Sequence, residues 1–246
     1  SSIAPLEAKS AEYSGMTDSR TMTPTKTARL KAQTELSQAA AAANAKKGDP
    51  FKAAAALAEA AESLEQVKVQ IKNDRDAHAE ADRSLKAASA QLGSAEQAAR
   101  AAAADKVQDS AAISAAYRKV EALQTAYAAA KENFSEPNGD WNAVDREADR
   151  ITAEAASAAA TLTNEVQAAA QASNAISSAA DKVREATNWT GSYGIGVDGS
   201  PGAPDLGQAR SALAAGRYDD AKREAESARR AAAAAIDEAE ARVARE

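Results

Sequence analysis

The fold is decided by the stretch FKAAAALAEAAESLEQVKVQI at residues 51–71, in which apolar residues recur every seven positions. Two sets of residues carry this repeat: Leu57, Leu64 and Ile71, and between them Ala53, Ala60 and Val67. Such a/d spacing over three heptads is typical of a helix that packs lengthwise against another helix. The repeat continues more weakly beyond residue 80, and no strong helix breaker follows before residue 104. We therefore predict one long helix over residues 51–104, in which residues 72–76 and Gly93 are the places where we expect a kink or turn.

The composition of the chain favours helices around a thin core. The 246 residues include 72 alanines but only 29 Leu, Ile, Val and Phe residues, well below the share in a typical globular domain. Alanine is the strongest helix former, and its small side chain lets helices approach closely. These numbers exclude a β-sandwich, a barrel and a thick-cored α/β enzyme. We expect an all-α fold: an elongated antiparallel bundle of long Ala-rich helices, arranged as spectrin-like or coiled-coil hairpins.

The charge and the missing cysteines exclude several classes of site. The formal net charge is −6, from 36 acidic and 30 basic residues, whereas a nucleic-acid binder needs a basic stripe. We therefore predict no nucleic-acid partner. Without cysteine there is no disulfide, thiolate metal site or cysteine nucleophile. No run of 18 apolar residues occurs, and the chain starts without methionine and stops in a helical pattern. We expect a fragment that meets a membrane only through segments outside this chain.

Proline and glycine divide the chain into four predicted parts. Residues 1–23 are rich in Ser and Thr and predict a flexible or loosely docked leader. Residues 24–188 predict the long-helix bundle, with Thr23 as the N-cap before a proline at the first helical position. Residues 189–204 hold five of the 11 glycines and predict one Gly/Pro-rich loop. Residues 205–246 predict a C-terminal helical hairpin.

One short motif, which we call the glycine punctuation, recurs three times along the chain. The segments that share it are Gly48-Asp49-Pro50, Gly139-Asp140-Trp141 and Gly216-Arg217-Tyr218. In each of them glycine turns the chain, and a ring-bearing residue follows two positions later. Small or apolar residues then stand 5, 9, 12 and 16 positions after the glycine. The long intervals fit three-helix, spectrin-like units or stacked helical hairpins, with a new helix starting at each punctuation.

This punctuation carries a family resemblance. The segment from Ala212 to Ile236 resembles the helical region that follows the TPM domain in bacterial envelope proteins, as do residues 48–57 and the Gly-rich segment that starts at Trp189. The glycine punctuation is also similar to that of spectrin-like repeats in bacterial septation-ring regulators. The likeness covers residues 28–246, includes no TPM domain and carries over no catalytic residue. It implies a membrane-anchored bacterial protein of the cell envelope, with an elongated helical module for partner contacts.

The single histidine is the strongest candidate for chemistry. Asp74 and Asp82 lie one helical turn on either side of His78, on the same face of the predicted helix. Such a face can bind a divalent metal, but one histidine with unpaired acids is poor equipment for acid–base catalysis. We favour the other interpretation of this pattern, a solvent-facing polar stretch over residues 73–82. We assign no catalytic, metal or cofactor-binding residue, and we expect no cofactor.

Three aromatic residues are candidates for contact with a partner. Trp189 and Tyr193 belong to the Gly-rich loop, which we expect to turn as a short hairpin at Asp198-Gly199, and Tyr218 opens the last helix. Exposed aromatic residues on loops often bind partners. We favour packing against the bundle as the role of Trp189 and Tyr193. Trp189, Tyr193 and Tyr218 remain the candidates for contact with a partner.

These features predict a non-catalytic structural, scaffolding or protein–protein interaction module of a larger protein. Its partners would be other proteins, through helix–helix contacts. The seam at Leu57, Leu64 and Ile71 also allows a homodimer, although a core within one chain explains it as well. Two alternatives stay open: a membrane-remodelling or lipid-binding helical rod, and a metal- or ligand-dependent enzyme. The acidic net charge argues against strong binding to anionic lipid.

Overall fold

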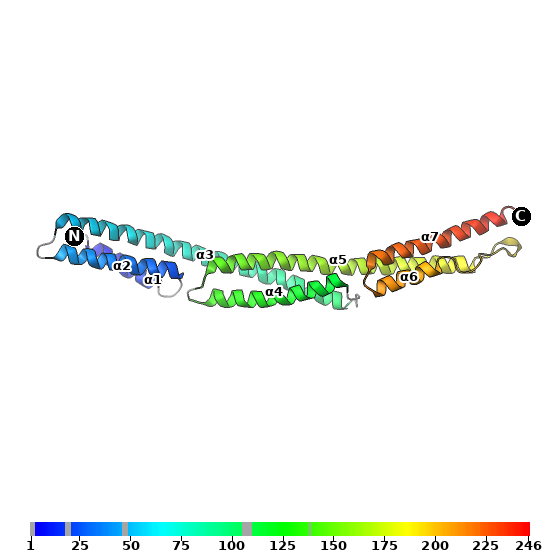
Figure 1. Ribbon diagram of the computed structural model, residues 1–246, viewed down its shortest axis with the longest axis horizontal. Helices are drawn as coiled ribbons and strands as arrows, with labels where there is room; N and C mark the ends of the chain where they lie inside the picture. The colour runs from blue at the N-terminus through cyan, green and yellow to red at the C-terminus, as the bar shows by residue number, and fades with distance from the viewer. Residues whose placement is uncertain (1–2, 18–20, 46–48, 105–109, 138) are drawn as a thin grey trace. The chain divides into compact units, whose positions relative to one another are not determined.

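The computed structural model describes residues 3–17, 21–45, 49–104, 110–137 and 139–246 (Figure 1). Helix makes up 89% of the structure, and the described ranges contain no strand. The predicted all-α fold of packed helices is therefore confirmed. The helices in these ranges are α1 (Ile3–Thr17), α2 (Thr23–Asn44), α3 (Pro50–Ala104), α4 (Ala111–Ser135), α5 (Trp141–Asn188), α6 (Ala203–Ala214) and α7 (Tyr218–Val243), with a short 3₁₀ turn, η1 (Ser192–Gly194).

The chain divides into two compact units. Unit 1 consists of Ser1–Gln91 and Leu123–Glu154, and unit 2 of Leu92–Ala122 and Ala155–Glu246. Helices α3, α4 and α5 each contribute residues to both units. The predicted helix over residues 51–104 is present as α3, and it passes Gly93 without a break.

The first core of unit 1 lies among α1, α2 and α3. Its buried members are Tyr13 from α1, Ala32 and Leu36 from α2, and Ala60, Leu64, Val67 and Ile71 from α3. Residues 3–17 therefore form a packed helix, and the expectation of a flexible or loosely docked leader is corrected for them. Leu6 and Tyr13 stand seven positions apart, so a helix presents both on one face. Leu6 packs against the cluster in which Tyr13 is buried.

The seam predicted for residues 51–71 extends along most of α3. Its buried positions follow spacings of three and four residues or their sum: Ala53, Ala60, Leu64, Val67, Ile71, Asp74, Ala81, Leu85, Ala88, Leu92, Ala95 and Ala102. Half of them are alanine, whose small side chain lets neighbouring helices approach closely. Exposed charged residues occupy the outer faces of α3.

Among the described residues, no helix combines the length and the apolar character that crossing a bilayer requires.

The three glycine punctuations precede helix starts, as predicted. Helices α3, α5 and α7 begin at Pro50, Trp141 and Tyr218. A Cβ on Gly139 would stand 2.2 Å from a backbone oxygen near the end of α4, so only glycine fits this turn. Gly216 has a φ of 69°, in the left-handed region, and a Cβ there would lie 3.1 Å from backbone atoms just before α4.

Two aspartates cap these helices. The Asp49 Oδ1 accepts a hydrogen bond of 2.9 Å from the backbone N–H of Phe51 at the start of α3. The Asp140 Oδ1 accepts one of 3.0 Å from the N–H of Ala143 at the start of α5. Both are N-caps of the expected kind. Gly48, the first residue of the first punctuation, lies outside the described residues.

The start of α2 differs from the prediction. Met22 is its N-cap and Thr23 its first helical residue, so the assignment of Thr23 as N-cap was one residue too late. No side chain of the cap itself satisfies the first turn. The carboxylate of Asp74 on α3 instead accepts a hydrogen bond of 2.8 Å from the Met22 N–H. A distant residue thus satisfies the backbone N–H of the N-cap residue.

The second core cluster lies in unit 2, among α5, α6 and α7. Its buried members are Ala172, Ile176, Ala179, Val183 and Ala186 of α5, Leu206, Ala209 and Ala212 of α6, and Tyr218, Ala221, Ala225, Ala228, Ala232 and Ile236 of α7. Helix α5 ends at Asn188, as predicted, and α6 begins at Ala203, two residues before the expected start. At this start Gly202 lies against the backbone of α7: a Cβ on it would stand 2.3 Å from the Ala228 oxygen.

Candidate functional site

The Gly-rich loop between α5 and α6 is a small ordered hairpin. Thr190 and Gly196 form an isolated antiparallel bridge, and η1 closes the turn between them. The chain therefore reverses at Ser192–Gly194, and the predicted turn at Asp198-Gly199 is wrong. Gly199 nevertheless has a φ of 72°, so it makes a second bend on the way to α6.

Arg242 holds this loop against the end of α7. Its Nη2 donates a hydrogen bond of 3.2 Å to the Gly196 oxygen, and its Nη1 lies 3.6 Å from the Asp198 carboxylate. Gly191 lies so close to the Trp189 ring and to α7 that an added Cβ would approach both to 2.7 Å. The loop is thus fixed by packing around Trp189 and by the hydrogen bond from Arg242.

The structure treats the three predicted partner-binding residues differently. Trp189 is partly buried and packs against the core of unit 2. The side chain of Tyr193 lies outside the described part of the chain. Tyr218 is 5% exposed and belongs to that core, because the first residue of α7 turns its ring inward. Tyr218 therefore offers little surface to a partner, and its predicted role is corrected to packing.

His78 lies in an aromatic cluster of unit 1. Its ring centroid is 4.5 Å from that of Phe134 on α4 and 4.8 Å from that of Trp141 on α5, and the contact with Trp141 is edge-to-face. Trp141 is fully buried, and its Nε1 has no hydrogen-bond partner in the structure. The interpretation of residues 73–82 as a solvent-facing stretch is therefore wrong for Asp74, which is buried, whereas His78, seven positions after Ile71, is partly buried.

The three residues considered for a metal site have other partners. The Asp74 carboxylate accepts the Met22 hydrogen bond, and Asp82 forms an ion pair of 2.6 Å with Lys86. His78 packs between aromatic rings. Across the described ranges, no group of three or more His, Asp or Glu side chains is placed to hold a metal ion. The spacing of four residues places these side chains along one helix, but each of them interacts with a different neighbour.

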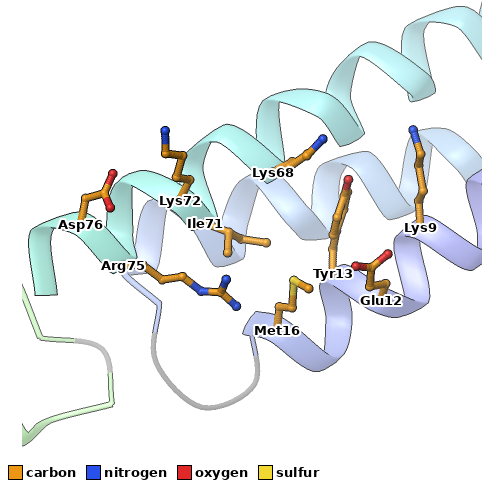
Figure 2. Close-up of a pocket in the computed structure, with 9 residues that line it drawn as sticks. All are labelled: Lys9, Glu12, Tyr13, Met16, Lys68, Ile71, Lys72, Arg75 and Asp76. Carbon is orange, nitrogen blue, oxygen red and sulfur yellow. The ribbon is translucent and has the colours of Figure 1, made fainter. Parts of the chain in front are cut away.

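A pocket of about 430 Å³ lies between α1 and α3 in unit 1 (Figure 2). Its lining residues are Lys9, Glu12, Tyr13 and Met16 from α1, and Lys68, Ile71, Lys72, Arg75 and Asp76 from α3. Tyr13 and Ile71 are buried and make an apolar floor with Met16. Figure 2 shows Arg75 extended from α3 toward Met16, across the space between the two helices.

An ion-pair cluster stands at one end of this pocket. The Lys9 ammonium donates a hydrogen bond of 2.9 Å to Glu65, whose carboxylate also lies 3.6 Å from Lys68. The hydrogen bond and the negative charge of Glu65 raise the pKa of Lys9 above its ordinary value. The hydrogen bond from Lys9 and the charge of Lys68 lower the pKa of Glu65. The cluster joins α1 to α3.

Sequence reasoning missed this pocket because it treated residues 1–23 as a leader. A signal was present on α3, where Lys68, Lys72 and Arg75 follow the spacing of four and three residues that places side chains on one helix face. The opposing wall could only be found by recognising that Leu6 and Tyr13 belong to a helix.

Comparisons of the chain with protein-family models, with curated proteins and with solved structures found no match. The resemblance to helical regions of bacterial envelope proteins therefore rests on the residues quoted for it. The envelope location that it implies is a prediction.

Proposed function

We propose that this chain is a non-catalytic structural module of a larger protein, and that it holds protein partners along its helix surfaces. The observation that supports this most is the buried seam of α3, which keeps its spacing from Ala53 to Ala102 and is half alanine. Small side chains at contact positions allow close approach of helices along their length. The buried residues thus pack helices against one another, which fits a structural module better than an enzyme with an active-site cavity.

In this proposal α3 and α5 serve as coiled-coil or spectrin-like struts. Both helices contribute residues to both units, so each runs from one unit into the other as a continuous helix. A cell-envelope location, as implied by the resemblance, belongs to the same proposal. The partner surface would be formed by outer helix faces, where Leu30 and Val69 are each 56% exposed.

The proposal can be tested by photo-crosslinking in cells that make the protein. Benzoylphenylalanine would replace Leu30 or Val69 on the outer faces, and Leu64, which is 1% exposed, would serve as the buried control. The outer positions should each give a defined adduct with a protein, which is a second copy of this chain if the module is a homodimer. The Leu64 position should react only within its own chain.

Two further measurements separate the alternatives. Lipid adducts from Leu30 and Val69 without protein adducts, together with co-sedimentation of the chain with vesicles, would favour the lipid-binding rod and contradict the scaffold. An enzyme that depends on His78 would lose its activity in His78→Ala. A scaffold requires that this variant give the same protein adducts, provided that circular dichroism shows the same helix content.

A further inference from the structure

The pocket between α1 and α3 has the size and the lining of a small-molecule site. Its volume of about 430 Å³ falls within the range of roughly 300–1,000 Å³ that is common for ligand pockets. The floor is apolar and the rim is charged, so the pocket suits a ligand with two chemically different ends. Nothing in the scaffold function requires such a pocket.

Positive charge dominates the rim. Four basic and two acidic side chains line the pocket: Lys9, Lys68, Lys72 and Arg75, and Glu12 and Asp76. Lys9 and Lys68 share Glu65. Across the part of the chain that the structure describes, Lys72 and Arg75 have neither an ion pair nor a side-chain hydrogen bond. The charge that remains to be balanced is therefore at the Lys72–Arg75 end.

The floor beside this end is built for an aliphatic group. Tyr13 and Ile71 are 5% and 3% exposed, which gives a rigid apolar base. Met16 is 36% exposed, and its unbranched side chain can adjust to the shape of a ligand. Covering Met16 would remove apolar surface from water, which favours binding.

We propose that this pocket binds a small amphipathic anion, a carboxylate with an aliphatic tail of medium length. The planar guanidinium of Arg75 can bind a carboxylate through two parallel hydrogen bonds, and the Lys72 ammonium adds a second positive charge. The tail then lies on Met16, Tyr13 and Ile71. The positive charge of the rim favours a ligand with an anionic head. The apolar floor favours a ligand whose other end is aliphatic rather than polar.

The test is calorimetric titration of the full chain with decanoate, kept below the concentration at which it forms micelles. We expect saturable binding of one decanoate per chain. Arg75→Ala and Lys72→Ala should each weaken binding by about tenfold, because each removes a charged partner of the carboxylate. The matched control is Lys86→Ala, a lysine of α3 that pairs with Asp82 and does not line the pocket. Its affinity should equal that of the wild type.

Further arms make the result decisive. Decyltrimethylammonium has the same tail with a cationic head and should not bind. Met16→Asp should abolish decanoate binding without loss of helix content by circular dichroism. Equal binding of both detergents, no decanoate binding, or unchanged affinity in Arg75→Ala would each overturn the proposal. Binding to phosphatidylglycerol vesicles without binding of monomeric decanoate would also overturn it and would indicate a lipid surface instead.

Discussion

The carboxylate of Asp74, buried on α3, accepts a hydrogen bond of 2.8 Å from the backbone N–H of Met22, the residue that caps α2. Asp74 is 3% exposed and occupies a position in an otherwise apolar seam. A buried carboxylate is costly unless its oxygens are satisfied. The contact therefore fixes the start of α2 at one level of α3, which a purely apolar seam would not specify.

Replacing Asp74 should loosen this junction. Asp74→Ala should lower the free energy of unfolding by about 1.5–3 kcal/mol, the usual contribution of a hydrogen bond to a charged group. Asp74→Asn keeps an acceptor oxygen and should lose less. Urea denaturation measures both changes, and hydrogen exchange should speed up first in the opening turn of α2.

The control for this prediction is Asp76→Asn, two positions away on an exposed part of α3. Its stability should change by no more than about 0.5 kcal/mol, as for most surface substitutions. If Asp74→Ala lowered the free energy of unfolding no more than this control does, the buried carboxylate would not stabilise the junction.

The seam shows how much of the fold the sequence could predict. Heptad spacing from Leu57 to Ile71 predicted a long packed helix, and counting on by the same spacing reaches Asp74 and His78. Their polarity suggested a solvent-facing stretch. The sequence does not show which distant residue would satisfy a polar group if it were buried. Met22, which satisfies Asp74, is 52 residues away.

The candidate pocket was harder to predict for a related reason. The Ser- and Thr-rich composition of residues 1–23 favoured a leader, and helix α1 gains its stability from packing Tyr13 against α3 rather than from propensity. Tyr218 differs in the opposite direction. It was a candidate for contact with a partner, whereas the first turn of α7 buries it.

Two glycines of unit 2 should respond to alanine in opposite ways. Gly93 lies inside α3, and no atom lies within 4 Å of an added Cβ. Gly93→Ala should stabilise the protein by about 0.5–1 kcal/mol, because glycine is the poorer helix former. Gly202 has a φ of 83°, and its added Cβ would stand 2.3 Å from a backbone oxygen of α7. Gly202→Ala should destabilise by about 1–3 kcal/mol through strain and overpacking.

Thermal unfolding of both variants checks this pair of predictions. Each substitution adds one methyl group, so the difference between them isolates the local backbone and its neighbours. A loss of stability in Gly93→Ala would mean that the helix is irregular there. A neutral Gly202→Ala would mean that α6 can move away from α7 without cost.

The loop between α5 and α6 should depend on Arg242 but not on its ion pair. Arg242→Ala removes the hydrogen bond to the Gly196 oxygen, so Trp189 should gain exposure as the loop leaves α7. Asp198→Asn should have almost no effect, because the Asp198 side chain is 97% exposed and surface ion pairs contribute little. Nuclear magnetic resonance of the Trp189 indole N–H reports both variants, and the buried Trp141 signal is the internal reference. Equal shifts in the two variants would contradict this division of roles.

The pair of Lys9 and Glu65 makes the docking of α1 sensitive to pH. Because the hydrogen bond from Lys9 and the charge of Lys68 lower the pKa of Glu65 in the folded protein, its contribution is present above the ordinary value. That contribution is lost in acid, as the pH falls below about 4 and through the lowered folded value. The pKa of Lys9 is raised, so its contribution is lost only in strong alkali, above about pH 10.

Thermal unfolding of the wild type and of Glu65→Gln over a series of pH values from 7 downward tests this dependence. The wild type should be slightly more stable at pH 7, and the difference should vanish as the pH falls through the lowered folded pKa of Glu65. The effect should be small and should shrink in 1 M salt, because both partners are about half exposed. Glu62→Gln, at an exposed position of the same helix, should show no such difference. A difference between wild type and Glu65→Gln that does not change with pH over the acid range would mean that Glu65 acts through packing rather than through its charge.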